Sequence, residues 1–577
     1  MSIFEIFRKK DKLDAPWGKY YKEDDLDIKI PNISMYDQVK ISSYRYPNNT
    51  AISYEGKKIN YRILIKKIDK IAVSLSKYGI KKGDIVSICL PNIPEALYVL
   101  YALNKIGAIA NMVHPLSAEE EIKEAVNSTN SRILVFTDMF YEKIENKLDD
   151  TCLEKVLIVS PSDSLSNIKR VGYKFLTKGK YKKISYNSFI MKLSTFQNKY
   201  YDSKLELTKR FGKDTPAVIL HSGGTSGKPK NVVLQNRAFI LGSKQEKICL
   251  KKLRPGDCCL GIMPNFHGFG LSVCMHTPLT LGCYTILVPK FDSKKFDILF
   301  KKTKPTCVLG VPTLFEALLT NNNVKHLDLS NLKYVISGGD ILSSSLEEKV
   351  NTYLSAHNSK SHITQGYGLS EALAAVTLAY DDVNKSGSIG VPLPSNHVKI
   401  IDPSTRKKVP PHIIGEIVIH SKALMMGYLN DEAETNAALQ IHDDGHIWLH
   451  TGDLGYMDED GFIFYQGREK RMIITSGYNV YPSHIEEVIE KHPDVLQCSV
   501  VGIPHSYKGS VAKAFIVLKD GRHSLLVKND IKSYCKKNLA KYMVPAEFVY
   551  RKKLPKTKLG KVDFKKLQSD IGSDDDE

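Results

Sequence analysis

Long apolar runs are missing from this sequence. No stretch reaches the roughly eighteen consecutive apolar residues that a membrane-spanning helix requires. Residues 1–10 place their basic side chains after a very short apolar patch, which reverses the order found in a secretory signal peptide. We therefore expect a cytoplasmic protein that neither spans a membrane nor is secreted.

Cysteine patterns that would indicate a metal site or a disulfide framework are missing as well. The ten cysteines are scattered, with no C-x-x-C pair and no cluster of histidine and cysteine. Zinc sites and disulfide frameworks both need regular cysteine spacing. We interpret these cysteines as small buried hydrophobic residues.

The composition is that of a globular protein. Of the 577 residues, 42% are hydrophobic and 25% are charged, which argues against a disordered chain. A chain of this length is too long for one core, so we expect a large domain and at least one smaller one. The 82 basic and 63 acidic residues give a net charge of +19, which fits either a lysine-rich composition or an anionic partner.

Alternating strand and helix patterns predict an α/β protein with largely parallel sheets. In the first block, residues 84–90 and 133–136 have the apolar pattern of strands, and residues 95–105 have the pattern of a helix. The same alternation resumes later and continues through strands at 307–310 and 334–337.

The pattern of predicted elements changes in the last third of the chain. Short strands such as 398–401 and 415–419, separated by Pro, Gly and Asp turns, predict a small β subdomain. We therefore expect an N-terminal domain, 1–467, and a small α+β C-terminal domain, 468–577. The elements expected in the C-terminal domain are helices near 483–491 and 529–539 and strands near 498–501 and 514–518.

A glycine-rich segment follows the apolar strand predicted at 216–220. Backbone N–H groups of such a loop can approach phosphate oxygens because glycine has no Cβ. The segment differs from the nucleotide-triphosphatase loop, because three residues separate Gly223 from Gly227 and Pro229 follows Lys228. A flexible Gly/Ser turn is the alternative. The segment is Ser222-Gly223-Gly224-Thr225-Ser226-Gly227-Lys228-Pro229-Lys230.

Four further motifs occur in a fixed order after this loop. With it, they give the chain a resemblance to the adenylate-forming acyl-CoA synthetases that runs from about Tyr46 to Leu567. The motifs are Gly366-Tyr367-Gly368-Leu369-Ser370-Glu371, His450-Thr451-Gly452-Asp453, Gly467-Arg468-Glu469-Lys470 with Gly477-Tyr478-Asn479-Val480-Tyr481-Pro482, and Leu554-Pro555-Lys556-Thr557-Lys558-Leu559-Gly560-Lys561.

The resemblance implies a two-step acid–thiol ligase that uses ATP, Mg²⁺ and coenzyme A. A carboxylate attacks the α-phosphate of ATP and releases pyrophosphate, and the acyl-AMP then passes its acyl group to coenzyme A. The enzyme must neutralise the charge that develops at phosphorus. Lys561 is the implied catalytic cation, Glu371 the implied ligand of Mg²⁺, and Ser370 a hydroxyl where the family more often has threonine. A carboxylate that complements a helix dipole is the alternative for Glu371.

The same resemblance implies a nucleotide site. The glycine-rich loop would hold the β- and γ-phosphates, Tyr367 would stack on adenine, and Asp453 would accept hydrogen bonds from the ribose hydroxyls. A turn aspartate is the alternative for Asp453. The residues implied to contact ATP are Ser222, Gly223, Gly224, Thr225, Ser226, Gly227, Lys228, Lys230, Gly338, Gly339, Asp340, Gly366, Tyr367, Gly368, Asp453 and Arg468.

The second half-reaction implies a mobile C-terminal domain. It would rotate about a hinge at Lys470, withdraw Lys561, and present Ser476 and Gly477 to the pantetheine of coenzyme A. Asn479 is implied to touch the nucleotide. An ordinary exposed lysine is the alternative for Lys470.

His267 matches an aromatic position that gates the acyl tunnel, with a core histidine as the alternative. Residues 266–278 and 338–342 should line the acyl pocket and are mostly small or apolar, so a medium- or long-chain fatty acid is favoured as the substrate. Three other hypotheses remain: an acyl-AMP ligase that loads a carrier protein, an aryl or amino-acid adenylating enzyme, and a non-catalytic lipid-binding protein.

Several positions depart from the family pattern. Asn231 and Asn236 replace a usual glycine and histidine, His484 replaces an acidic residue, and Phe564 replaces an arginine past the lysine. These departures bear on rate and domain orientation more than on reaction type.

Residues 167–200 form a basic segment with interleaved aromatic residues and no acid. A solvated loop and contact with an anionic membrane surface both fit this pattern. None of the nucleic-acid motifs accompanies the segment, so we expect no nucleic-acid partner.

Overall fold

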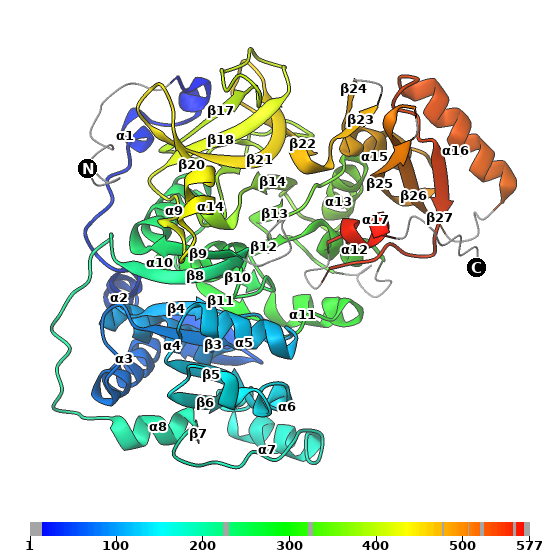
Figure 1. Ribbon diagram of the computed structural model, residues 1–577. Helices are drawn as coiled ribbons and strands as arrows, with labels where there is room; N and C mark the ends of the chain where they lie inside the picture. Colours follow the sequence, from blue (N-terminus) through cyan, green and yellow to red (C-terminus); the bar gives the residue numbers. More distant parts are fainter. Residues whose placement is uncertain are drawn as a thin grey trace.

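A computed structural model describes residues 14–222, 230–320, 327–475, 478–505, 507–519, 524–557 and 561–569. Within these ranges the strands form four sheets, of nine, eight, five and five strands. The two larger sheets are mostly parallel and lie in the N-terminal part, and one five-stranded sheet belongs to the C-terminal end of the chain (Figure 1). The predicted α/β class is confirmed.

The eight-stranded sheet contains the strands predicted at 84–90, 133–136 and 216–220. Its strands from β8 to β7 run parallel, because helices connect them, and β9 and β19 extend the other edge in antiparallel pairing. The order along the sheet is β19 (Gly427–Tyr428), β9 (Lys230–Gln235), β8 (Pro216–Ser222), β4 (Ile109–Met112), β3 (Ile85–Cys89), β5 (Ile133–Thr137), β6 (Lys155–Val159), β7 (Ile190–Lys192).

The nine-stranded sheet contains the strands predicted at 307–310 and 334–337. Its six central strands, β14 to β1, are parallel, and short antiparallel strands close both edges. The order is β16 (Val391–Pro392), β15 (Thr377–Leu378), β14 (Ile363–Tyr367), β13 (Tyr334–Gly338), β12 (Cys307–Gly310), β10 (Cys258–Gly261), β11 (Tyr284–Leu287), β1 (Thr50–Tyr54), β2 (Lys57–Asn60).

Helix α4 (Pro94–Ile106), predicted at 95–105, is apolar on nearly every side and almost wholly buried. Its neighbour α3 (Tyr61–Tyr78) is capped by the Asn60 side chain, which accepts a hydrogen bond from the Ile63 amide. The remaining α-helices of the N-terminal part are α1 (Glu23–Leu26), α2 (Met35–Arg45), α5 (Glu119–Ser128), α6 (Glu142–Glu145), α7 (Asn167–Leu176), α8 (Leu193–Tyr200), α9 (Asn236–Cys249), α10 (Thr277–Thr280), α11 (Phe296–Thr303), α12 (Pro312–Thr320), α13 (Ser344–Ala356) and α14 (Glu432–Ala438).

The predicted small β subdomain is confirmed as an antiparallel sheet that contains the strands expected at 398–401 and 415–419. Its longest strand pairs on both sides and ends in the turn that leads to β22. The strands are β17 (Asn396–Ile401), β18 (Gly415–Ser421), β20 (Leu439–Ile441), β21 (Ile447–Met457) and β22 (Ile463–Arg468).

The C-terminal elements also form where the sequence predicts them. Helix α16 begins four residues before the predicted start, at Leu525 instead of Asn529. The boundary at 467/468 stays a prediction. It falls one residue before the end of β22, and the next strand, β23, belongs to a different sheet. The elements are β23 (Ile473–Thr475), β24 (Tyr478–Val480), α15 (Pro482–Glu490), β25 (Val495–His505), β26 (Gly509–Leu518), α16 (Leu525–Asn538), β27 (Glu547–Tyr550) and α17 (Phe564–Ser569).

The basic segment 167–200 is not one uniform surface. It folds as α7, β7 and α8, with β7 paired to β6 at the sheet edge and Phe196 fully buried. The hypothesis of a solvated loop is therefore wrong for the parts around Tyr173 and Phe196, which contact the core, whereas Phe175 and Tyr186 are exposed.

Nine of the ten cysteines are buried and free, as expected, whereas Cys152 is exposed. None of the helices in the described ranges has the length and apolar character needed to cross a membrane.

Candidate active site

The predicted phosphate loop starts and ends at one point. Ser222, at the end of β8, pairs across the antiparallel hairpin with Lys230, at the start of β9. Six of the predicted loop residues, Gly223, Gly224, Thr225, Ser226, Gly227 and Lys228, lie outside the described residues.

Lys230 is connected to Glu371 by side-chain contacts through Tyr428. Its ammonium forms an ion pair with Glu434, at 2.5 Å, and lies 4.6 Å from the ring centroid of Tyr428. The Tyr428 hydroxyl in turn donates a 2.9 Å hydrogen bond to Glu371 Oε1. The loop and the carboxylate expected to hold Mg²⁺ are therefore connected through one tyrosine.

The backbone around Glu371 is tightly folded. A Cβ on Gly368 would lie 1.1 Å from the carbonyl oxygen of Ala374, so only glycine fits there. A Cβ on Gly268, next to His267, would lie 2.2 Å from the Leu373 carbonyl oxygen. Two predicted segments thus meet at the strained turn after Ser370, where Leu373 has a positive φ of 71°.

Two glycines form a flat surface at the carboxyl ends of neighbouring strands. Gly338 of β13 pairs in register with Gly366 of β14, and parallel α/β sheets bind ligands at such strand ends. Gly339 follows with a φ of 80°, which turns the chain away from the sheet. Asp340 is exposed after this turn, and its side chain accepts a hydrogen bond from the Ile341 amide.

Asp453 is the centre of the best-defined polar cluster. Its Oδ2 accepts a 2.6 Å hydrogen bond from the Tyr367 hydroxyl, and its Oδ1 accepts one from Tyr465, at 3.3 Å. Arg468 Nε lies 2.8 Å from Oδ1 and also donates through Nη1 to the Thr451 carbonyl oxygen. The structure thus brings together three predicted residues from three strands.

Burial sets the protonation behaviour of this cluster. Asp453 is 1% exposed, and burial raises the pKa of its carboxyl although Arg468 and the two tyrosine hydroxyls act in the opposite direction. Burial and the adjacent carboxylate raise the pKa of Tyr367 well above its usual value. The tyrosine therefore stays a neutral hydrogen-bond donor.

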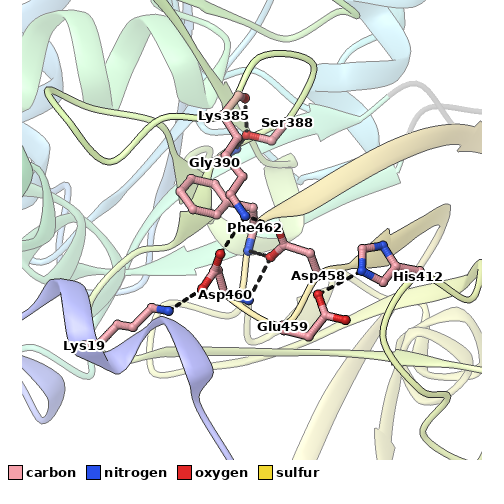
Figure 2. A network of polar contacts seen from close by, with 9 residues as sticks. All are labelled: Lys19, Lys385, Ser388, Gly390, His412, Asp458, Glu459, Asp460 and Phe462. Atoms are coloured by element: carbon pink, nitrogen blue, oxygen red, sulfur yellow. Dashed lines mark hydrogen bonds and ion pairs between the residues drawn. The ribbon is translucent and has the colours of Figure 1, made fainter.

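The register that places Asp453 opposite Arg468 is fixed by the turn between β21 and β22. Asp458 Oδ1 accepts from the amides of Asp460 and Phe462, which closes the turn. Figure 2 shows Lys385 between the carboxylates of Asp458 and Asp460, at 2.5 and 2.7 Å, while Lys19 reaches Asp460 from the other side. The N-terminal segment and the loop between β15 and β16 therefore both hold the hairpin that carries the site.

His267 is influenced electrostatically by Lys561, which lies far later in the sequence. His267 is buried, and burial is the main reason that its pKa falls to about 4. The positive charge of Lys561 is the second cause of this lowered pKa. Phe266 stacks between His267 and His114, with ring centroids 5.4 and 4.2 Å away.

Lys561 is held by a small hairpin. The Thr557 amide donates a 2.7 Å hydrogen bond to the Lys561 carbonyl oxygen. The backbones of Lys556 and Val562 form an isolated antiparallel β-bridge. Three residues after Lys561, the ring of Phe564 lies 3.3 Å from the guanidinium carbon of Arg471. The aromatic departure from the family pattern is thus a cation–π partner of the residue after Lys470.

The remaining predicted residues are less informative. Lys470 lies in a short 3-10 turn directly after β22. Asn479 is exposed on β24, which belongs to a different sheet from the strands that carry Asp453 and Arg468. Ser476 and Gly477 lie outside the described residues.

Two of the departures from the family pattern have structural roles. Asn236 is fully buried, and its Oδ1 accepts hydrogen bonds from the Met35 amide and from Asn104. Asn231 lies opposite His221 in the β8–β9 hairpin and donates to Ser128.

Sequence reasoning missed Tyr465, Tyr428, His114 and His221. Tyr465 could have been found from the sequence. The Asp-Gly turn at 460–461 predicts a hairpin, and counting outward from that turn pairs the strand of Tyr465 with the strand of Asp453. A bulge in this pairing shifts the count. Tyr428 and His114 have no such signal, since only the fold brings them near Glu371 and Phe266.

In the part of the chain that the structure describes, no group of three or more His, Cys, Asp or Glu side chains could hold a metal ion. A site built from one carboxylate and phosphate oxygens does not need such a group.

Comparisons with known proteins agree in family and fold. A model of the AMP-binding enzyme family matches residues 39–429, and a model of the AMP-binding enzyme C-terminal domain matches residues 484–561. The chain is 33% identical to a long-chain-fatty-acid–CoA ligase of Bacillus subtilis over 95% of this chain and 96% of that protein. It is 30% identical to a probable 4-coumarate–CoA ligase of Dictyostelium discoideum, over 87% and 88% of the two chains.

A crystal structure of the anthranilate CoA ligase AuaEII in complex with anthranoyl-AMP has the same fold. It superposes with a TM-score of 0.82 over 95% of this chain and 98% of that chain, at 22% identity.

Proposed function

Because the chain belongs to the family of AMP-binding enzymes, we propose that it joins a carboxylic acid to coenzyme A in two steps at this site. The observation that carries the proposal is the buried cluster in which Tyr367, Asp453 and Arg468 contact one another. In the first step, a carboxylate oxygen bonds to the α-phosphorus of ATP and pyrophosphate leaves. In the second, the thiol of coenzyme A attacks the acyl carbonyl and AMP leaves.

Lys561 supplies the positive charge for the first step. Its ammonium is a compact point charge that can stabilise both the carboxylate and the oxygens of the α-phosphate. His267 stays neutral beside it, because burial and the lysine both oppose protonation of the imidazole. A neutral gate does not compete with Lys561 for the anionic groups.

Asp453 holds the ribose in this proposal. Its Oδ1 already faces Tyr465 and Arg468, whereas its Oδ2 accepts only from Tyr367 and keeps a lone pair for a ribose hydroxyl. Burial raises the pKa of this carboxyl, and the positive charge of Arg468 opposes that rise. Tyr367, fixed through its hydroxyl, offers its ring to adenine beside Gly338, Gly339 and Asp340.

Glu371 suits a magnesium ion, because Mg²⁺ takes one or two carboxylates together with phosphate oxygens. The hydrogen bond from Tyr428 fixes one of its oxygens in place. The ion would neutralise charge on the triphosphate, next to the loop from Ser222 to Lys230.

The second step places the C-terminal domain, 468–577, in another orientation, with the hinge at Lys470. In that state Ser476 and Gly477 would face the pantetheine, and Asn479 the nucleotide. A carrier-protein thiol could take the place of coenzyme A, and a direct comparison of the two acceptors distinguishes them.

The favoured substrate is a medium- or long-chain fatty acid. The relative with 33% identity acts on long-chain fatty acids by its name, and residues 271–275 of the expected acyl pocket are apolar or small and buried. An aryl acid is the second candidate, because a 4-coumarate ligase is 30% identical. We place the reaction in the cytoplasm, with access to an anionic membrane surface through part of 167–200.

A screen of carboxylic acids for pyrophosphate release tests the proposal. We expect release with ATP and a fatty acid of medium or long chain, followed by thioester formation when coenzyme A is added. Coumarate and benzoate serve as aryl controls, and amino acids as the third class. Failure of every acid to release pyrophosphate from the folded protein would reject the proposal.

A further inference from the structure

We infer that α7 is a docking helix for anionic lipid surfaces, inserted by an outward apolar stripe and held by flanking lysines. The stripe consists of Ile168, Val171 and Phe175, which are 88%, 69% and 79% exposed. A helix on a globular protein normally turns its apolar stripe toward the core. Here the stripe faces away from the protein, so its burial requires a partner.

The orientation of α7 is fixed by its other face. Tyr173 packs on the main core, and Arg170 donates to the carbonyl oxygens of Ser162 and Asp163. Arg170 and Tyr173 are three positions apart, so they define one side of the helix. The stripe residues, at spacings of three and four, lie on the opposite side. Fraying of a terminus is therefore not the reason for their exposure.

The charges around the stripe select an anionic partner. Lys174, Lys178, Lys180 and Lys183 are exposed, and none of these four is ion-paired with an acid within the described ranges. Two other lysines of the segment are already paired, Lys182 with Glu145 and Lys169 with Glu55. Of these cations, Lys174 lies on α7 itself and the other three follow the end of the helix.

A lipid surface fits this element better than a protein does. A helix of ten residues is about 15 Å long, and one face of it covers far less than the roughly 800 Å² per partner that a stable protein interface buries. An apolar stripe with lysines beside it is the pattern of a helix lying in the interface of an anionic bilayer. Each lysine near such a surface adds attraction, and the stripe adds burial in the acyl region.

The position of α7 is compatible with the proposed two-step reaction. Figure 1 places α7 at the lower end of the molecule and the C-terminal sheet with α16 at the upper right. Docking through α7 leaves the C-terminal domain clear of lipid and free to rotate. The docking itself does not depend on the reaction proposed above.

Vesicle sedimentation of the full-length protein tests the inference. We expect wild type to bind vesicles of phosphatidylcholine with phosphatidylserine, to bind weakly without phosphatidylserine, and to be released by salt. Ile168→Ser, Val171→Ser and Phe175→Ser together should weaken binding about tenfold or more. The matched control is Leu525→Ser with Leu526→Ser, which removes apolar side chains that are 77% and 82% exposed at the other end.

The lysines have a matched control of their own. Changing Lys174, Lys178, Lys180 and Lys183 to Gln should weaken binding about tenfold or more. The same change at the exposed lysines 536, 537, 541 and 552 should have little effect. Hexanoate-dependent pyrophosphate release should be unaltered in the α7 variants, so a failure of docking and a failure of the proposed reaction are separate results.

A tryptophan introduced into the stripe measures insertion directly. The two native tryptophans, Trp17 and Trp448, are buried, at 1% and 2% exposure, so their emission should not respond to vesicles. Phe175→Trp places an indole on the exposed stripe, and its emission should shift to shorter wavelength with anionic vesicles only. Binding without this shift, or binding that survives the serine substitutions, would overturn insertion. If the protein binds vesicles of neither composition, the inference of a lipid partner is rejected, and a protein becomes the expected partner of the stripe.

Discussion

The two sides of the site are built in different ways. The nucleotide side is a buried cluster in which Tyr367, Asp453, Tyr465 and Arg468 come from three strands and bind one another directly. The turn below it is closed by its own amides and by lysines from two distant segments. This side uses no residue after Arg468.

The Lys561 side depends on one loop. Lys561 is fixed by the short hairpin around Thr557 and Val562 and by the stack of Phe564 on Arg471. Across the site, the positive charge of Lys561 contributes to the lowered pKa of His267. A catalytic cation that acts through its charge can be withdrawn without breaking a buried network, which is what a two-step reaction at one site requires.

The largest expected effect is at Lys561. Lys561→Ala should slow acyl-AMP formation by roughly a hundredfold or more, since preorganised charges of this kind contribute about 3 kcal/mol. Thioester formation from supplied acyl-AMP should be nearly unchanged, because the lysine is withdrawn in that step. Pyrophosphate exchange and thioester assays measure the two rates.

The exposed neighbour Lys565 on α17 provides the control, and Lys565→Ala should leave both rates intact. An equal loss of both half-reactions in Lys561→Ala would contradict the division of the site into a fixed and a movable side.

A smaller effect is expected at Asp453. Asp453→Asn removes the charge opposite Arg468 and should raise the KM for ATP about tenfold or more, because hydrogen bonds to a charged group contribute about 1.5–3 kcal/mol. The KM for the acid should change little. Tyr465→Phe, which removes only the longer hydrogen bond to Asp453, should have a weaker effect in the same direction. Unchanged ATP affinity in a folded Asp453→Asn variant would refute the ribose assignment.

The stack of Phe564 on Arg471 should matter less than either. Phe564→Leu removes a cation–π contact that contributes about 0.5–2 kcal/mol, and should slow adenylation about three- to tenfold by loosening Lys561. Phe564→Tyr keeps the ring and should restore the rate. A loss that is equal in the thioester assay would mean that Phe564 stabilises the domain as a whole instead of positioning Lys561.

The strands that support the site were easier to predict from sequence than the contacts within it. The strands at 84–90, 307–310 and 334–337 are short apolar runs, whose burial follows from composition, and the α/β order follows from their alternation. The contact of Tyr367 with Asp453 was not predicted, because it joins residues 86 positions apart.

The basic segment shows the limit of pattern reasoning. Ile168, Val171 and Phe175 have helical spacing, but the many lysines around them resemble a loop. Which way the stripe faces is set by Tyr173 and Arg170, whose contacts lie on other elements. A sequence can predict an amphipathic helix, but the direction of its apolar face depends on the fold.

The last prediction separates the stability of the fixed side from its chemistry. Glu246 on α9 is fully buried behind the expected acyl pocket, and burial raises its pKa from 4.5 to about 8. Its Oε2 has no hydrogen-bond partner in the described residues. The carboxyl is therefore protonated in the folded protein at neutral pH and ionised in the unfolded chain.

The sign of the resulting pH dependence is fixed by this raised pKa. Below pH 4.5 both states carry the proton and Glu246 adds no penalty, whereas between 4.5 and about 8 unfolding releases the proton. Stability should fall in that window by up to about 1.4 kcal/mol per pH unit and level off above it. Glu246→Gln removes the slope, so its Tm relative to wild type should rise from pH 5 to pH 8. The exposed Glu487→Gln should show no such trend, and ATP-dependent activity should survive Glu246→Gln; a Tm difference that does not change with pH would show that Glu246 is ionised in the folded protein.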